Sequence, residues 1–263
     1  MTWNVVTVAF GNEDFKIGQK FLEELSQKSE VNSISFGDDD LYGSDVYKEN
    51  EKWFSEENNR GWFAWKPYFI LKAMEGLEDG DMIMYLDTKD IFHPEIFQFV
   101  DDMIEDDFCL LPIGGPSNGE YTKRDCFVYM ECDEEDYWDS PQLEAGFSFW
   151  KVSDKSKEVL SEWLKWCLDE RVNGEDSSFS EQEELPNFKG CRHDQSILTN
   201  LAIRDGLGAV GQDIRAWIEC NADFWYQRQE RGTTRVLRPI DTYMMEIKNT
   251  VPYLPDPPEE EEE

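Results

Sequence analysis

Three short apolar runs near the start of the chain, separated by helical patterns, restrict most strongly what it can fold into. The runs cover residues 5–10, 34–36 and 82–86, and each has the length of a strand. Residues 14–29 place their apolar side chains on one helical face, and Pro67 fits the first position of a helix before the third run. This alternation predicts an α/β fold with a β-α-β opening.

The remainder of the chain continues the alternation. Residues 146–150 are predicted to form another strand, and residues 154–168 and 194–204 to form helices. The Ser- and Glu-rich stretch 173–184 is typical of a loop. Residues 255–263 combine prolines with five Glu, which predicts a disordered acidic tail.

The charge of the chain excludes several classes of partner. It has 58 Asp and Glu against 25 Lys and Arg, a formal net charge of −33, and no basic stripe. Such a surface repels nucleic-acid phosphates and anionic lipid headgroups, so no nucleic acid is expected as a partner.

The apolar runs are far shorter than the ~20 residues of a transmembrane helix. No basic leader precedes the first strand, which predicts a cytoplasmic protein. The sequence does not indicate the oligomeric state.

The turn after residues 82–86 holds the strongest local signal for a site. The chain lacks both the G-x-G-x-x-G and the P-loop motifs, so any nucleotide is bound in another way. Asp87 and Asp90 follow the third strand at its carboxyl end, where open α/β sheets bind ligands. Two carboxylates at this spacing can converge on Mg²⁺ or Mn²⁺. The alternative is an ordinary strand-end turn.

Five short motifs stand in a distinctive order: W-K-P-Y from Trp65, Y-x-D ending at Asp87, T-K-R-D from Thr122, Q-L-E-A-G from Gln142 and H-D-Q-S from His193. As an ordered set they resemble the small GT-A-fold glycosyltransferases of viral and bacterial polysaccharide pathways, over about residues 5–201. The resemblance implies a GT-A-like mixed central sheet flanked by helices in a single domain, residues 1–254. It also implies a nucleotide-sugar-binding half to about residue 112 and an acceptor half over about 113–254.

The resemblance implies a nucleotide diphosphate sugar as donor and a glycan or other hydroxyl group as acceptor. The basic side chains in the matching segments would offset the charge of the diphosphate in so acidic a chain, the alternative being ordinary surface charge. The candidate donor-binding residues are Val8, Ala9, Phe10, Arg60, Lys66, Asp87, Lys123 and Arg124.

A divalent cation, Mn²⁺ or Mg²⁺, is the cofactor that the resemblance implies. Asp87 matches the first aspartate of D-x-D, but Lys89 occupies the third position. Either Asp90 replaces it, which we favour, or no metal is needed. His193 is the candidate third ligand, although relatives have a later histidine that this chain lacks.

Glycosyl transfer passes through an oxocarbenium-like state that a carboxylate assists as a base or as a stabiliser. The resemblance places Glu144 near the acceptor or the reacting sugar carbon, and Asp194 and Gln195 beneath the donor sugar. We predict Glu144 or Asp194 as that carboxylate, with a helix N-cap as the alternative for Asp194. The competing functions are a sugar nucleotidyltransferase and a non-catalytic sugar-binding module.

Overall fold

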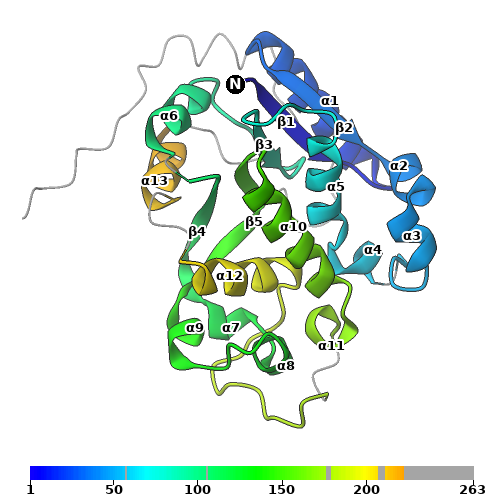
Figure 1. Ribbon diagram of the computed structural model, residues 1–263, viewed down its shortest axis with the longest axis vertical. Coiled ribbons are helices and arrows are strands. Elements are labelled where there is room, and N and C mark those ends of the chain that lie inside the picture. Colours follow the sequence, from blue (N-terminus) through cyan, green and yellow to red (C-terminus); the bar gives the residue numbers. More distant parts are fainter. Residues whose placement is uncertain (57, 105, 176–178, 207–210, 222–263) are drawn as a thin grey trace, which may run out of the picture.

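A five-stranded mixed sheet lies at the centre of the protein in the computed structural model (Figure 1). The structure describes residues 1–221 apart from positions 57, 105, 176–178 and 207–210. The strands are β1 (Trp3–Val8), β2 (Asn32–Phe36), β3 (Met82–Leu86), β4 (Phe108–Ser117) and β5 (Pro141–Lys151). Their order across the sheet is β2-β1-β3-β5-β4, with β1 parallel to β2 and β3, and β5 antiparallel to β3 and β4. The predicted single-domain α/β fold is confirmed.

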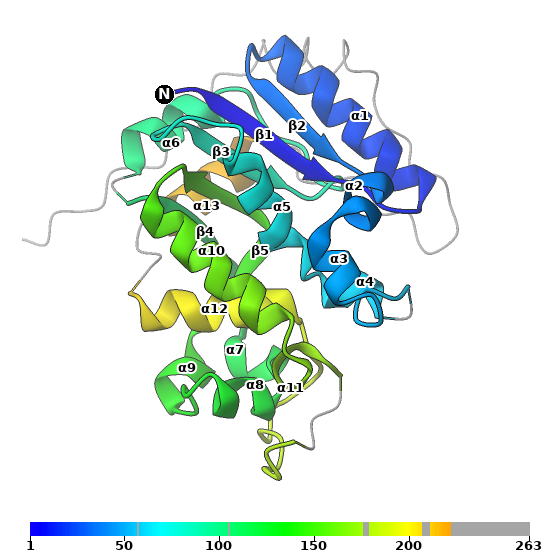
Figure 2. The same cartoon turned by 45° about the vertical axis from the view of Figure 1, so that its right-hand side comes forward.

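Helices cover both faces of the sheet, as the two views in Figures 1 and 2 show. One face packs against α1 (Glu13–Lys28), α6 (Ile96–Met103) and α13 (Gly211–Asn221). The other packs against α5 (Trp65–Met74), α10 (Asp154–Cys167) and α12 (Asp194–Arg204). Shorter helices fill the connections: α2 (Asp38–Gly43), α3 (Asp45–Glu49), α4 (Asn59–Trp62), α7 (Asn118–Tyr121), α8 (Arg124–Tyr129), α9 (Glu135–Asp139) and α11 (Glu170–Asn173).

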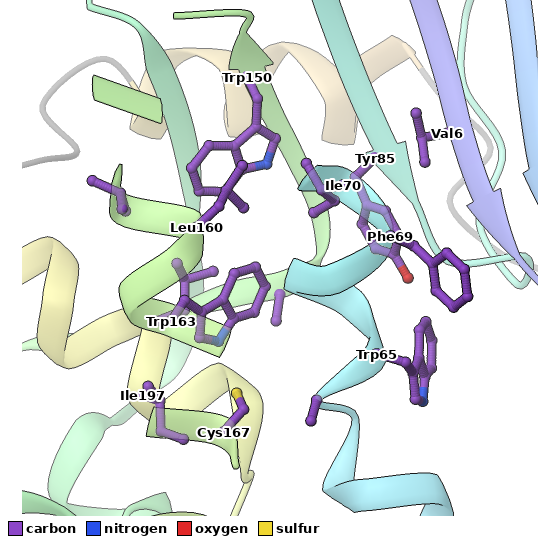
Figure 3. Packing of buried hydrophobic residues seen from close by; sticks show 14 of the residues in the cluster. Val6, Trp65, Phe69, Ile70, Tyr85, Trp150, Leu160, Trp163, Cys167 and Ile197 are labelled. Atoms are coloured by element: carbon purple, nitrogen blue, oxygen red, sulfur yellow. The ribbon is translucent and has the colours of Figure 1, made fainter. Parts of the chain in front are cut away.

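The two helical layers explain why β1 and β3 read as continuous apolar runs. In β1, Val6 packs in the core with α5 and α10, whereas the adjacent Val5 packs in the core with α1 and α6. Strands buried on both faces need apolar residues at successive positions. On the α10 side, Trp150 of β5 stacks against Trp163, with ring centroids 6.3 Å apart (Figure 3). These packed layers fix the carboxyl ends of β1 and β3 in place.

Among the elements that differ from the sequence predictions are β5, α5 and β4. β5 begins at Pro141, before the expected residue 146. Helix α5 begins at Trp65, so Pro67 lies within the first turn, where its missing N–H costs no hydrogen bond. β4 is absent from the predictions, and its register shifts around Pro112, which cannot donate to the ladder.

The remaining segments bear on the loop and tail predictions. Residues 174–184, where described, contain no helix or strand, as predicted for most of 173–184. The predicted tail 255–263 lies outside the described residues, as do residues 222–254 of the expected domain. No helix within the described ranges is long and apolar enough to cross a membrane.

Candidate functional site

A cavity of about 700 Å³ lies beside the carboxyl ends of β1 and β3. Ligands of open α/β sheets bind at this position. Its wall includes residues from β1, the start of α1, α4, the start of α5, the turn after β3, strands β4 and β5, and the start of α12. The lining residues are Val8, Phe10, Phe15, Arg60, Phe63, Trp65, Lys66, Asp87, Thr88, Lys89, Ile113, Glu144, Gly146, Cys191, Arg192, His193, Asp194 and Gln195.

The charge of the cavity wall differs from that of the whole chain. The wall carries the cations Arg60, Lys66, Lys89 and Arg192 and the carboxylates Asp87, Glu144 and Asp194. Over the whole chain, 58 acidic residues stand against 25 basic ones. Basic side chains are therefore concentrated at this cavity, which favours an anionic ligand.

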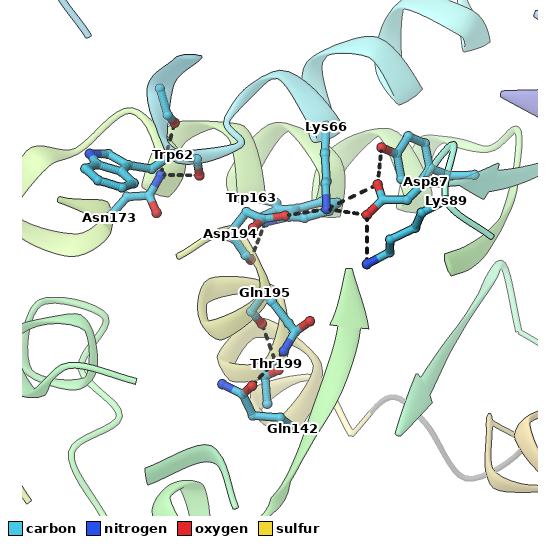
Figure 4. A network of polar contacts seen from close by, with 12 residues as sticks. Trp62, Lys66, Asp87, Lys89, Gln142, Trp163, Asn173, Asp194, Gln195 and Thr199 are labelled. Carbon is cyan, nitrogen blue, oxygen red and sulfur yellow. Dashed lines mark hydrogen bonds and ion pairs between the residues drawn. The ribbon is translucent and has the colours of Figure 1, made fainter. Parts of the chain in front are cut away.

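Asp87 follows β3 directly, and its carboxylate is contacted on both oxygens (Figure 4). The Tyr85 hydroxyl donates to Oδ1 at 2.9 Å. Lys66 Nζ lies 3.4 Å from Oδ1 and 3.5 Å from Oδ2, and Lys89 Nζ lies 3.6 Å from Oδ2. Beneath the carboxylate, an added Cβ on Gly146 would lie only 2.7 Å from Oδ2. Glycine at this position lets the carboxylate rest against β5.

Lys66 of α5 lies between two carboxylates. Its Nζ is 3.4 Å from Asp194 Oδ2, at ion-pair distance but without hydrogen-bond geometry, and Figure 4 shows it between Asp194 and Asp87. Burial lowers the pKa of Lys66, but the attraction of Asp194 and Asp87 outweighs burial and raises it. Burial raises the pKa of Asp87, but Lys66 and Lys89 outweigh it and hold that pKa below its ordinary value. Burial raises the pKa of Asp194 to about 6, against the opposing effect of Lys66.

The start of α12 places Asp194 in the cavity. His193 occupies the N-cap position, and Asp194 is the first helical residue, so the alternative reading of Asp194 as the cap is wrong. His193 Nδ1 lies 3.0 Å from the carbonyl oxygen of Asn173, which can only accept, so Nδ1 carries the hydrogen. The ring stacks on Trp62 with centroids 4.3 Å apart, and burial lowers the pKa of His193. The imidazole is therefore neutral at pH 7.

A strained backbone segment precedes α5. Arg60, Gly61, Trp62 and Phe63 have φ angles of 55°, 78°, 49° and 68°. Side chains other than glycine rarely adopt this left-handed region, and such strain persists only where surrounding contacts enforce it. Asn173 Nδ2 supplies two of these contacts by donating to the carbonyl oxygens of Gly61 at 3.4 Å and Trp62 at 3.2 Å (Figure 4).

Gln195 is held by a buried polar network. Its Nε2 donates to Gln142 Oε1 at 2.6 Å, and Gln142 Nε2 in turn donates to Ser196 Oγ at 3.3 Å and Thr122 Oγ1 at 3.4 Å. The network joins β5 to α12. The two motifs that contain Gln142 and Gln195 therefore meet in space.

Glu144 of β5 forms an ion pair with Arg215 of α13, at 2.5 Å between Oε2 and Nη1. Both side chains are mostly buried. Because Arg215 fixes one oxygen of Glu144, the orientation of this carboxylate in the cavity is set by α13.

The predicted donor-binding residues divide into two groups. Val8, Phe10, Arg60, Lys66 and Asp87 line the cavity, as do all three predicted catalytic residues. The lining does not include Ala9, Lys123 or Arg124.

The three residues outside the lining have other surroundings. Ala9 donates its backbone N–H to Phe36. Arg124 pairs with Asp133 at 2.8 Å, and Lys123 is 1% exposed. Donor binding by these three residues stays a prediction without support from the cavity.

The predicted metal ligands do not converge. No cluster of three or more His, Cys, Asp or Glu suited to a metal ion occurs among the described residues. Asp87 is engaged by two ammonium groups, whereas Asp90 is buried and outside the cavity lining. Burial raises the pKa of Asp90 to about 8, so this carboxyl is largely protonated at pH 7. The donor set does not fit a divalent cation, and metal binding by Asp87, Asp90 and His193 stays a prediction.

Sequence reasoning misses several residues of the site. Arg192 stands directly before the H-D-Q-S motif, and its basic charge in so acidic a chain is a usable signal. Tyr85 lies within the apolar run of β3, where it reads as a core residue. Arg215 carries no local signal, because its contact with Glu144 spans 71 residues.

Neither a protein-family model nor a curated protein matches the sequence significantly.

Proposed function

We propose that this protein is a glycosyltransferase that moves a sugar from a nucleotide diphosphate sugar to a glycan or other hydroxyl acceptor. The observation that carries the proposal is the cavity wall, where four basic side chains meet three carboxylates in a protein of net charge −33. A nucleotide diphosphate is an anion, and glycosyl transfer needs carboxylates beside it. Both requirements are met in one cavity.

The fold supports the same proposal. The cavity lies at the carboxyl ends of the parallel strands β1 and β3, beyond which β5 and β4 run antiparallel. This arrangement agrees with the GT-A-like fold that the sequence motifs imply. The donor would lie across Val8 and Phe10 at the end of β1, with its diphosphate toward Arg60, Lys66 and Lys89.

The carboxylates have different surroundings, which suggests different roles. Asp194 is 2% exposed and paired with Lys66, so it suits contact with the bound donor sugar. Glu144 is held by Arg215 and retains 17% of its side-chain exposure, so it suits contact with an acceptor that enters from solvent. We assign Glu144 as the carboxylate that assists the transfer, with Gln195 positioning the sugar.

A panel of UDP-, GDP- and dTDP-sugars, with a CMP-sugar as the monophosphate comparison, tests donor binding by thermal shift. A diphosphate donor at 100 times its Kd stabilises the protein by about 2.7 kcal/mol, roughly 5–10 °C for a chain of this size. The donor that shifts the melting temperature is then incubated with sugar acceptors, and release of the nucleotide diphosphate is measured.

Asp87→Asn and Asp79→Asn form a matched pair for this experiment. Asp79 is 86% exposed and precedes β3, at the opposite end from the cavity. Asp87→Asn should abolish the shift and Asp79→Asn should preserve it. A donor that binds without any release of nucleotide diphosphate to any acceptor would favour the non-catalytic sugar-binding module.

A further inference from the structure

We propose that the ammonium groups of Lys66 and Lys89 take the place of a divalent cation in this site, so that a diphosphate binds, and transfer proceeds, without metal. The inference deepens the proposed function and rests on it for the identity of the donor. It departs from the expected Mn²⁺ or Mg²⁺ requirement.

The carboxylate of Asp87 already faces two ammonium groups and a hydroxyl group. An ionised carboxylate offers about four lone-pair sites. Oδ1 faces the Tyr85 hydroxyl at 2.9 Å and Lys66 at 3.4 Å. Oδ2 faces Lys66 at 3.5 Å and Lys89 at 3.6 Å, with Gly146 packed against it. A divalent cation at Asp87 would lie beside two ammonium groups of the same sign.

The other expected ligands point to the same conclusion. Asp90, which follows Asp87 in the same turn, is outside the cavity lining. The ring of His193 stacks on Trp62, and its Nδ1 bonds to the carbonyl of Asn173. Within the part of the chain that the structure describes, no group of three or more His, Cys, Asp or Glu is arranged to hold a metal ion.

Lys66 and Lys89 are two ammonium groups that line the cavity beside Asp87 and can donate to a diphosphate there. Lys66 is 8% exposed and held in place by Asp87 and Asp194, so it offers a fixed charge to the cavity. Lys89 is 48% exposed, and its ion pair with Asp87 is long. Exposed ion pairs contribute little free energy, so Lys89 can turn from Asp87 to a phosphate oxygen at small cost. Asp87 keeps Lys66 in place when Lys89 turns away.

We call Lys66 and Lys89 together the clamp. Calorimetric titration of inorganic pyrophosphate in EDTA tests it without a sugar nucleotide. Wild type should bind pyrophosphate, and Lys89→Gln should weaken binding at least tenfold, because the variant loses a charged hydrogen-bond donor to the phosphate. Lys72→Gln is the matched control, since Lys72 lies on α5 with 47% exposure and pairs only locally with Glu75. Lys89 is chosen over Lys66 because its exposed side chain can be changed without unpairing buried carboxylates.

Three outcomes would overturn the clamp. One is pyrophosphate binding that is absent in EDTA and appears with Mn²⁺. Another is equal affinity in Lys89→Gln and wild type. The third is tight binding of Mn²⁺ alone that is lost in Asp87→Asn.

The donor panel, run with EDTA and with Mn²⁺, separates this inference from the proposed function. A donor that binds and reacts equally in both conditions supports both proposals. A strict Mn²⁺ requirement would leave the transferase standing and overturn the clamp. Pyrophosphate binding in EDTA with no response to any nucleotide sugar would support the clamp and overturn the transferase.

Discussion

The ammonium nitrogen of Lys66 lies 3.4 Å from a carboxylate oxygen of Asp194, and both side chains are almost completely buried. Lys66 lies at the same distance from Asp87. One cation on α5 therefore compensates carboxylates from two other elements, the turn after β3 and the start of α12. Stability and the proposed donor binding therefore involve the same three side chains.

Replacing Lys66 by Met should destabilise the protein strongly. Removing one partner of a buried ion pair leaves an uncompensated charge and costs about 3–5 kcal/mol. We expect a loss of that size in the free energy of unfolding, measured by urea denaturation at pH 7. Lys72→Met should change it by less than about 1 kcal/mol, because Lys72 is exposed. A similarly small loss for Lys66→Met would contradict the proposed compensation, and adding Asp194→Asn should recover part of the loss.

Asp90 should make the protein less stable as the pH rises. Burial raises its pKa to about 8 in the folded state, from an ordinary 3.8. Between these values the folded protein keeps a proton that the unfolded chain releases, so the free energy of unfolding falls by at most about 1.4 kcal/mol per pH unit. Above about pH 8 both states are deprotonated and this dependence ends.

Asp90→Asn removes this titration. The free energy of unfolding is measured by urea denaturation at pH 6, 7 and 8. Between pH 6 and 8, the value for the variant should rise by about 2 kcal/mol relative to that of wild type. For the exposed substitution Asp79→Asn, the free energy of unfolding should depend on pH in the same way as for wild type. Parallel curves for Asp90→Asn would mean that Asp90 is ionised in the folded protein.

Gly146→Ala should disrupt the site through a single methyl group. The new Cβ would lie 2.7 Å from Asp87 Oδ2, so the carboxylate must move away from Lys66 and Lys89. We expect a loss of about 1–3 kcal/mol in stability and at least a tenfold weaker affinity for pyrophosphate. Gly114→Ala is the control, because a Cβ there meets nothing within 4 Å. Equal effects of the two substitutions would refute the steric argument.

Glu144→Gln should impair turnover without impairing donor binding. Loss of a catalytic carboxylate typically lowers the rate by about 10²–10⁴. Arg215→Met should lower kcat about tenfold, because Glu144 loses the contact that orients it, while the Kd of the donor stays unchanged. Arg171→Met, which removes an exposed arginine paired with Asp169, should leave both quantities at wild-type values. Weaker donor binding in Glu144→Gln would instead assign Glu144 to the donor site.

Much of the fold is predictable because two-sided burial leaves a strong pattern. The runs that became β1 and β3 are apolar at successive positions, and the long helices carry one apolar face. The position of Asp87 at the end of a buried strand is predictable for the same reason. Strand β4 escapes prediction because its register shifts at Pro112 interrupt the alternation.

The contacts that define the site are less predictable than its location. Lys66 shows as a basic residue in an acidic chain, but nothing local indicates that it lies between Asp87 and Asp194, the latter 128 positions later in the sequence. The partner of Glu144 comes from α13, beyond the segment covered by the motif resemblance. Such pairings depend on how the helices pack on the sheet.

The left-handed segment before α5 makes one part of the cavity wall dependent on residues that the ribosome adds much later. Gly61 and Trp62 are held by Asn173 and His193, more than 100 residues later in the sequence. When β1, α5 and β3 have left the ribosome, the residues that enforce this backbone have not yet been made. The left-handed segment therefore emerges before the contacts that enforce it can form. A truncated product ending before α11 would contain the parallel strands but would lack Asn173 and His193, which hold this part of the cavity wall.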